Sequence, residues 1–377
     1  MKDKKPSFLW IVADGFTEFN SSYFTCVVPH NALVKAGYKS RIIHMKNWLD
    51  NNAVLRANIA TADVIIIQRV LLEETARMIQ FVKSQGKKLL VSFDDAYHLI
   101  GEENAAFDFW GRGLVEVNYG DIKAKKSIGT HPVEQFKNML KTVSAGITPS
   151  RLLSSDWAPY GAMTYLPNFL ESHRYSTEKK KITKKTSIGW GGSLSHLTSF
   201  SGSGAQDALR EFVPNEDSVI FQLIGDRRLI KQIGLSQNDM IFIDYVMFFD
   251  WPSVLASFDI GIAPLSGLYD QRRSRLKVME YIACGIPFVA TKSVVYEDFF
   301  DCKSGIFVEQ GAQNSCQEEN KRGWLAALRK IAANLDECRQ VALGEAKRYF
   351  PLYDNISNAD LIANTLTMEN YYELRRK

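Results

Sequence analysis

Short apolar runs rich in β-branched residues recur along the first half of the chain, separated by segments of helix length. These runs stay apolar at nearly every position, which is typical of strands that are covered on both faces. They occupy 8–13, 40–44, 63–67, 88–93, 145–148 and 163–166. The segments 23–36 and 72–84 between them have helical spacing, and Gly37 and Gly86 follow where helix C-caps belong. The alternation predicts a parallel α/β sheet.

A second alternation follows in the other half of the chain. Its apolar runs occupy 187–190, 219–224, 240–244, 260–264, 288–291 and 305–308. The polar stretch 171–186 separates the halves, and no aromatic residues interleave with its lysines, so it favours a solvated linker over a nucleic-acid surface. We therefore expect a domain at 1–170, a charged linker at 171–186 and a second domain at 187–350. A C-terminal helix at 351–377 either belongs to the second domain or crosses back to complete the first.

Composition narrows the class of protein. The 377 residues are 46% hydrophobic and 23% charged, which is typical of a globular protein with two cores and excludes a mainly disordered chain. A net charge of +4 is too small to indicate nucleic acid or an anionic membrane as the main partner. No apolar run approaches the ~20 residues of a membrane span. The five scattered cysteines lack C-x-x-C spacing, which favours a reducing compartment. We expect a cytoplasmic protein, with peripheral membrane contact left open.

The most informative chemistry lies in 258–291, where a strand ends at Pro264 and a helix is predicted to open near Ser274. Arg273, Lys277 and Glu280 would share one helical stripe, because they are spaced i, i+4, i+7. A helix start with two cations suits a diphosphate, and a carboxylate one turn deeper suits the two hydroxyls of a ribose. The alternative is a surface helix with a Lys277–Glu280 ion pair, and spacing alone favours neither.

The run LKVMEYIACGIPFVAT, residues 276–291, resembles the donor-site signature of GT-B glycosyltransferases of the family 4 type. IGWGGSLSH (188–196) and FQLIGD (221–226) resemble the first two strands of that family's donor domain. SAGITPSRLL and YLPNFLE match the end of its acceptor domain, so the resemblance covers most of 140–310. It implies an α/β GT-B fold, in which two Rossmann-like domains with doubly wound parallel sheets face a cleft. The first domain would take the acceptor and the second the nucleotide-sugar.

The resemblance also implies roles for residues of the second domain. Glu280 would bind the ribose, and Gly191 and Gly192 would allow close approach to the donor phosphate, which a Cβ would obstruct. The diphosphate would meet backbone N–H groups of Ser274, Arg275 and Leu276, with charge from Arg273 or Lys277. The remaining donor-site candidates are Ser193, His196, Gly225 and Asp226. A helix-cap or surface role for His196 and an N-cap role for Asp226 stay open.

One position departs from the family pattern. Many relatives carry a glutamate near the transferred sugar where this chain has Arg272, which leaves the donor sugar open. In the first domain, Asp94, Asp95 and His98 follow a strand, and the resemblance places them at the acceptor hydroxyl. Caps and turns are the alternative for each. Arg69 and Asn20 are weaker acceptor-side candidates.

These observations predict a glycosyltransferase that moves a sugar from a nucleotide-diphosphate donor, UDP or GDP, to a hydroxyl of a glycan, lipid-linked or small-molecule acceptor. The resemblance implies retention of anomeric configuration. We expect no metal and no cofactor, because no metal-ligand cluster is visible in the sequence. The expected catalytic residues are Lys277, Arg273, Asp95 and His98. The alternatives are a nucleotide-sugar epimerase of the same fold and a non-catalytic nucleotide- or sugar-binding protein.

Overall fold

The computed structural model describes residues 5–14, 21–119, 122–311 and 317–369. Its contacts divide the chain into two compact units. The first unit comprises Met1–Leu170, Arg272–Ser274 and Asp354–Lys377, and the second comprises Glu171–Gln271 and Arg275–Tyr353. Each unit is built around one six-stranded sheet.

The sheet of the first unit has the strand order β2-β1-β3-β4-β7-β8, with all neighbours parallel. Its strands are β1 (Ser7–Val12), β2 (Lys39–His44), β3 (Val64–Gln68), β4 (Lys88–Ser92), β7 (Ala145–Thr148) and β8 (Met163–Tyr165). Each lies within one residue of the range that its apolar run predicts. All six positions of β1 are buried, but β2 is half exposed because it is an edge strand.

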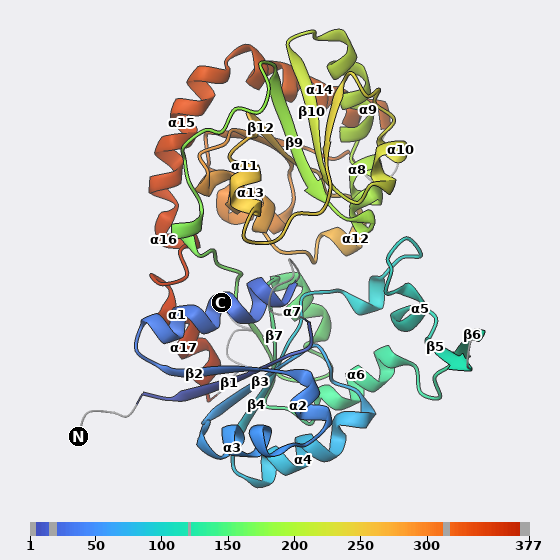
Figure 1. Ribbon diagram of the computed structural model, residues 1–377, viewed down its shortest axis with the longest axis vertical. Helices are drawn as coiled ribbons and strands as arrows, with labels where there is room; N and C mark the ends of the chain where they lie inside the picture. The colour runs from blue at the N-terminus through green and yellow to red at the C-terminus, as the bar shows by residue number, and fades with distance from the viewer. Residues whose placement is uncertain (1–4, 15–20, 120–121, 312–316, 370–377) are drawn as a thin grey trace. The chain divides into compact units, whose positions relative to one another are not determined.

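Helices cover both faces of this first sheet. They are α1 (Val28–Lys35), α2 (Met45–Leu49), α3 (Ala53–Thr61), α4 (Ala76–Ser84), α5 (Phe107–Trp110), α6 (Pro132–Leu140), α7 (Arg151–Trp157) and α17 (Ala359–Thr367). Helices α1 and α17 lie along one face, and α3 and α4 along the other (Figure 1). The predicted helix 23–36 begins as the π-helical turn Tyr23–Val27 and continues as α1. A feature absent from the prediction is the antiparallel hairpin of β5 (Leu114–Tyr119) and β6 (Ile122–Ser127).

The second sheet has the order β11-β10-β9-β12-β13-β14, again with parallel neighbours. Its strands are β9 (Thr186–Gly192), β10 (Val219–Gly225), β11 (Met240–Ile243), β12 (Ile260–Ala263), β13 (Phe288–Thr291) and β14 (Gly305–Val308). The strand order reverses between β9 and β12. In open parallel sheets ligands bind at the carboxyl ends of the strands beside such a reversal, so this edge is the place to look for a site.

The helices of the second unit also lie on both sides of their sheet. They are α8 (Leu197–Gly202), α9 (Ala205–Phe212), α10 (Arg228–Ile233), α11 (Trp251–Leu255), α12 (Gly267–Asp270), α13 (Leu276–Ala283), α14 (Gln317–Ala333), α15 (Leu335–Arg348) and α16 (Phe350–Tyr353). Helices α9 and α14 pack together on one side, and α13 and α15 on the other (Figure 1). A buried cluster that includes Trp190, Phe200 and Trp324 fills the space between sheet and helices.

The segment 171–186 differs from the solvated linker that its lysines indicate. The ammonium of Lys179 is 2.8 Å from Asp259 Oδ1 and donates to Ser257 O at 3.1 Å. The backbone N–H of Lys180 donates to Ala256 O at 2.9 Å. The segment is therefore anchored to the second unit by specific bonds, which a count of its charges does not reveal.

The end of the chain returns to the first unit. Asn355 Nδ2 donates to Val28 O at 3.1 Å, and Tyr38 donates to Asp360 at 2.8 Å, so the segment before α17 and the helix itself are tied to the α1 side of the first sheet. The described part of the predicted helix 351–377 is therefore two helices, of which α16 groups with the second unit and α17 with the first. Within the described ranges, no helix combines the length and the hydropathy that crossing a bilayer requires.

Candidate functional site

The start of α13 differs from its prediction. The helix begins at Leu276, two residues after the predicted start at Ser274, with Arg275 at the N-cap. The buried guanidinium of Arg275 pairs with Asp298 and donates to Leu352 O at 3.2 Å, so its side chain holds the turn that leads into the helix. Arg273 precedes the helix, so the expected helical stripe of Arg273, Lys277 and Glu280 is wrong for its first member. Arg273 and Ser274 also group with the first unit by their contacts.

Lys277 lies in the first turn of α13, and its ammonium is at the carboxyl end of β9. The Nζ atom donates to Gly191 O and lies 5.5 Å from the centroid of the Trp190 ring. The first N–H groups of any helix have no acceptor within the helix. A cation and a set of helix N–H donors therefore occur together beside the end of β9.

Glu280 lies one turn further along the helix and is 4% exposed. Its Oε1 atom accepts hydrogen bonds from the Tyr175 hydroxyl and from Trp251 Nε1, both at 2.9 Å. Burial raises the pKa of this carboxyl to about 7, although the Tyr175 bond and the charge of Lys277 act in the opposite direction. Its Oε2 atom receives no hydrogen bond from the side chains that the structure describes, which leaves it available to a ligand hydroxyl.

The two donors to Glu280 were missed by the sequence reasoning. Tyr175 lies in the segment whose composition favours a solvated linker, and Trp251 lies outside the motifs that carry the sequence prediction. A buried carboxylate requires donors, but sequence does not tell which distant side chains supply them.

At the ends of β9 and β10, neighbouring atoms of the protein leave no room for a side chain larger than that of glycine. A Cβ added to Gly191 would come within 2.3 Å of the Trp251 ring, and one added to Gly192 within 2.7 Å of the Trp190 ring. Gly225 has a φ of +124°, and its added Cβ would lie 2.2 Å from Gly192 O. The close approach of Gly191 and Gly192 to a donor phosphate stays a prediction.

The other candidates at this edge are held by local bonds. Ser193 Oγ is 2.8 Å from Ser195 Oγ, and the backbone N–H of His196 donates to Ser193 O at 3.0 Å. Asp226 accepts from the backbone N–H of Arg228 at 2.9 Å and pairs with the Arg228 guanidinium, and these bonds lower its pKa. The N-cap of α10 is Arg227, so the N-cap role that the sequence left open for Asp226 is wrong, and the bond from Arg228 closes a turn before the helix.

In the first unit, a cluster of charged side chains follows β1, β3 and β4. Arg69, with a φ of +45°, pairs with Asp14. Asp94 follows β4, and burial together with the charge of Asp95 raises its pKa to about 7, against the opposing charge of Arg69. Asn20, a weaker candidate, lies outside the described residues.

His98 has a partner that the sequence does not identify. Its Nε2 is 3.1 Å from Asp156 Oδ2, and Asp156, on α7, also accepts from Arg272 at 2.7 and 3.1 Å. Because a carboxylate accepts, Nε2 carries the proton and Nδ1 the lone pair of the neutral ring. Burial lowers the pKa of His98, so the neutral form is favoured. The two oxygens of Asp156 thus hold both His98 and Arg272.

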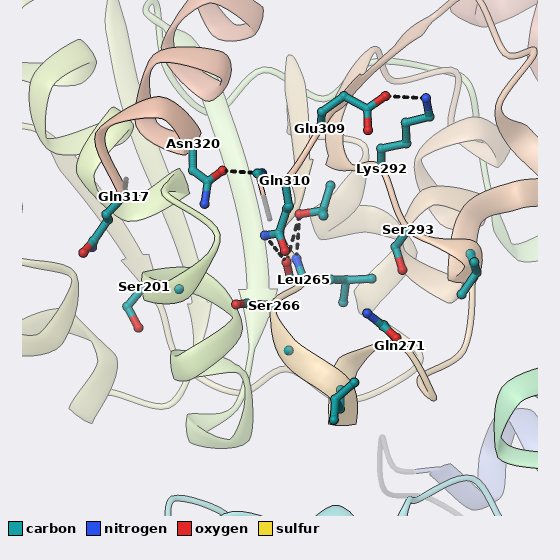
Figure 2. A pocket seen from close by; sticks show the side chains of 16 residues that line it. Ser201, Leu265, Ser266, Gln271, Lys292, Ser293, Glu309, Gln310, Gln317 and Asn320 are labelled. Atoms are coloured by element: carbon teal, nitrogen blue, oxygen red, sulfur yellow. Dashed lines mark hydrogen bonds and ion pairs between the residues drawn. The ribbon is translucent and has the colours of Figure 1, made fainter. Parts of the chain in front are cut away.

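Two further observations bear on the chemistry. Among the described residues, no group of three or more His, Cys, Asp or Glu side chains is placed to hold a metal ion. A cavity of about 900 Å³ in the second unit is lined in part by the segment 258–291, including Leu265, Gln271 and Thr291, but by none of the candidate site residues (Figure 2).

Comparison with known proteins supports the resemblance found in the sequence. Residues 201–334 match the profile of the family described as Glycosyl transferases group 1. No curated protein sequence matches the chain. One similar solved structure is Anabaena Alr3699/HepE in complex with UDP, with 14% identity, a TM-score of 0.59, and coverage of 96% of this chain and 99% of that chain.

Two other solved structures show the same arrangement of strands and helices. WaaG, described as a glycosyltransferase involved in lipopolysaccharide biosynthesis, has 12% identity and a TM-score of 0.60, covering 96% of this chain and 99% of its own. A putative UDP-N-acetylglucosamine 2-epimerase from Listeria monocytogenes has 10% identity and a TM-score of 0.51, covering 95% and 94%. At these identities the matches confirm the expected fold.

Proposed function

We propose that this chain, which has the GT-B fold and whose residues 201–334 match the family described as Glycosyl transferases group 1, moves a sugar from a UDP-sugar to an acceptor hydroxyl. The family match supports a transferase enzyme. The choice of a UDP-sugar as donor, the retention of configuration at the sugar C1 and the roles of the site residues are parts of this proposal. The observation that carries it is the buried Glu280 one turn after Lys277, with the Lys277 ammonium at the end of β9.

The first step of the proposal concerns the diphosphate. Lys277 Nζ donates to Gly191 O, which holds the ammonium at the carboxyl end of β9, where it would meet phosphate oxygens. The N–H groups at the start of α13, including that of Leu276, add the positive end of the helix dipole. Negative charge develops on the departing phosphate, and fixed donors of this kind lower the barrier by several kcal/mol. We therefore assign leaving-group stabilisation to Lys277 without a metal.

The second step concerns the ribose. Tyr175 and Trp251 both donate to Oε1 of Glu280, so they orient the carboxylate and leave Oε2 for the two ribose hydroxyls. The uracil is proposed by analogy with the UDP complex of HepE. GDP is the alternative donor nucleotide.

The third step concerns the acceptor. In the transfer, the bond between the sugar C1 and the phosphate oxygen breaks, and a bond between C1 and the acceptor oxygen forms. We propose that the acceptor proton passes to the leaving phosphate and that the configuration at C1 is retained, as the family resemblance implies. Asp95 and His98 position the acceptor. The hydrogen bond from His98 Nε2 to Asp156 leaves Nδ1 to accept from a neighbouring hydroxyl of the acceptor, so the reacting hydroxyl keeps its proton for the phosphate.

The test begins with a thermal-shift comparison of UDP and GDP, because a ligand that binds the folded state raises the melting temperature. UDP-sugars are then incubated with and without glycan acceptors, and UDP release is measured. We expect UDP to stabilise the protein and its release to depend on an acceptor. Isomerisation of the UDP-sugar without an acceptor would establish the epimerase, and nucleotide binding without any donor consumption would establish a binding protein.

A further inference from the structure

Three side chains of the first unit, His98, Asp156 and Arg272, are joined in one line of hydrogen bonds. His98 Nε2 is 3.1 Å from Asp156 Oδ2. The Arg272 guanidinium donates to Oδ2 from Nε at 2.7 Å and to Oδ1 from Nη2 at 3.1 Å. Two parallel bonds between a guanidinium and a carboxylate fix both groups more firmly than one bond does. Arg272 therefore determines the position and the charge balance of the carboxylate that holds the imidazole.

Only a small part of each of these side chains reaches the solvent. The exposed fractions are 27% for His98, 20% for Asp156 and 15% for Arg272. The buried ring of Trp157 lies beside the imidazole, with 5.5 Å between the ring centroids and an angle of 84° between the ring planes. Water and salt screen charges less in such surroundings than on an open surface. The charge of Arg272 therefore acts on the imidazole as well as on Asp156.

The carboxylate of Asp156 is stabilised by a cation because of its place in the helix. It lies in the last turn of α7, where the negative end of the helix dipole disfavours a further negative charge. Arg272 supplies that cation through both carboxylate oxygens. A proton added to His98 would place a second positive charge beside the guanidinium, although the carboxylate is already neutralised. The pairing of Asp156 with Arg272 therefore favours a neutral imidazole.

The balance of influences on His98 points to the same protonation state. Burial has the largest effect on the pKa of the imidazole and lowers it. Asp156 raises this pKa, whereas Arg272 and Lys137 of α6 lower it. Lys137 donates to Glu134 at 2.7 Å, which offsets part of its charge. Of the two cations, Arg272 therefore has the more direct influence on the protonation of His98.

We propose that Asp156 and Arg272 are positioning residues that act through His98. Arg272 neutralises Asp156, and Asp156 holds His98 as a neutral ring that carries its proton on Nε2 and its lone pair on Nδ1. A protonated ring has no lone pair and cannot accept a hydrogen bond from a hydroxyl of the acceptor. This inference rests on the proposed function for the use of the lone pair, but the state of the ring can be measured without any transfer reaction.

The test is long-range ¹H–¹⁵N NMR of the full chain, labelled at its six histidines and titrated with pH. The ring signals of His98 are those that disappear in His98→Asn. We expect the neutral ring of the wild type to carry its proton on Nε2. Arg272→Gln should raise the pKa of His98 by about 0.5–1 pH unit, and Asp156→Asn should lower it. Arg272→Lys keeps the positive charge, so its pKa for His98 should stay close to that of the wild type.

The matched control is Arg77→Gln, at an exposed position of α4, which should leave the pKa of His98 unchanged. Opposite shifts in Arg272→Gln and Asp156→Asn support the inference, because a purely structural role would not move one pKa in two directions. Shifts of the same sign, an equal effect of Arg77→Gln and Arg272→Gln, or a neutral wild-type ring protonated on Nδ1 would overturn it. The last outcome is measured on the wild type alone, so it does not depend on the folding of a variant.

Kinetics separate this inference from the proposed function. UDP release is measured against acceptor concentration at pH 6 and pH 8. Arg272→Gln should raise the KM for the acceptor about 2- to 5-fold at pH 6 and less at pH 8, because more of His98 is protonated at the lower pH. A shifted pKa with an unchanged KM would overturn the role of the ring at the acceptor. Absence of acceptor-dependent UDP release would instead contradict the proposed function, while the NMR titration still decides whether Asp156 and Arg272 control His98.

Discussion

At the scale of single residues, Glu280 is a buried acid whose two oxygens have different surroundings. Oε1 is occupied by Tyr175 and Trp251, and the pKa of the carboxyl is raised to about 7 by burial. An ionised carboxylate accepts hydrogen bonds more strongly than a neutral one. Its protonation state near neutral pH therefore controls how well it can bind a ribose.

We predict that UDP affinity increases between pH 6 and pH 8 partly through ionisation of Glu280. The substitution Glu280→Gln should weaken binding about tenfold at pH 8 and remove that part of the pH dependence. Isothermal titration calorimetry at both pH values measures this effect. Glu216→Gln, at an exposed position, is the control for the titration of UDP itself. Identical pH profiles for the two variants would remove Glu280 from the site.

Asp94 permits a stability prediction at the same scale. Its pKa is raised from 3.8 to about 7 in the folded protein, so the unfolded chain releases this proton at lower pH than the folded one. Stability from this group is therefore complete below pH ~4 and is lost as the pH increases to about 7. We expect Asp94→Asn to reduce the fall in melting temperature between pH 5 and pH 8. The control Asp50→Asn, at an exposed position, should leave that fall unchanged. Calorimetry measures both, and equal falls would contradict the burial of the charge.

At the scale of elements, the start of α13 is the feature with the clearest catalytic consequence. The substitution Lys277→Ala removes the ammonium beside Gly191, and we predict that kcat falls about 100-fold while KM changes little. Steady-state kinetics with a UDP-sugar measures the two constants. Lys231→Ala, at an exposed position on α10, is the control. A change confined to KM would show that Lys277 binds the ground state and the transition state equally.

The ends of β9 and β10 provide a matched pair of glycine substitutions. Gly225→Ala places a methyl group 2.2 Å from Gly192 O at a φ of +124°, so we expect the unfolding free energy to fall by more than about 2 kcal/mol. Gly344→Ala, inside α15 with nothing within 4 Å, should raise it by up to about 1 kcal/mol. Denaturant unfolding compares the two, and a tolerated Gly225→Ala would mean that β9 and β10 separate easily.

How far the sequence predicts the elements depends on their burial. The strands of both sheets were found within two residues, because a strand buried on both faces is an uninterrupted apolar run. The hairpin 114–127 was missed, since the lysines of its second strand obscure a strand signal. The start of α13 was placed two residues early, because the side chain that shapes it, Arg275, pairs with Asp298 far along the sequence.

Only those residues of the candidate site that lie close together in the sequence were predicted. Lys277 and Glu280 are recognisable because they lie within one short motif. Tyr175, Trp251 and Asp156 come from other segments, and only folding brings them to Glu280 and His98. The roles proposed for the motif residues stay predictions until the experiments above are done.

At the scale of the whole molecule, the first unit depends on residues from both ends of the described chain. Leu366 of α17 is fully buried, whereas Leu361 on the same helix is 49% exposed. We predict that Leu366→Ala lowers the unfolding free energy by about 2–5 kcal/mol and that Leu361→Ala changes it by less than about 0.5 kcal/mol. Chemical denaturation followed by circular dichroism measures both. Equal effects would show that α17 is not packed against the first sheet.

The return of the chain to the first unit has a consequence for its biosynthesis. Residues 171–353 leave the ribosome before α17 does, which takes roughly 10 to 40 s at 5–20 residues per second. During that interval the nascent first sheet lacks the helix that covers part of its α1 side, because the residues of the second unit are made before α17. The first unit is therefore completed only after the second unit has been synthesised, and a chaperone that shields apolar surface would act on the earlier-made half in the meantime.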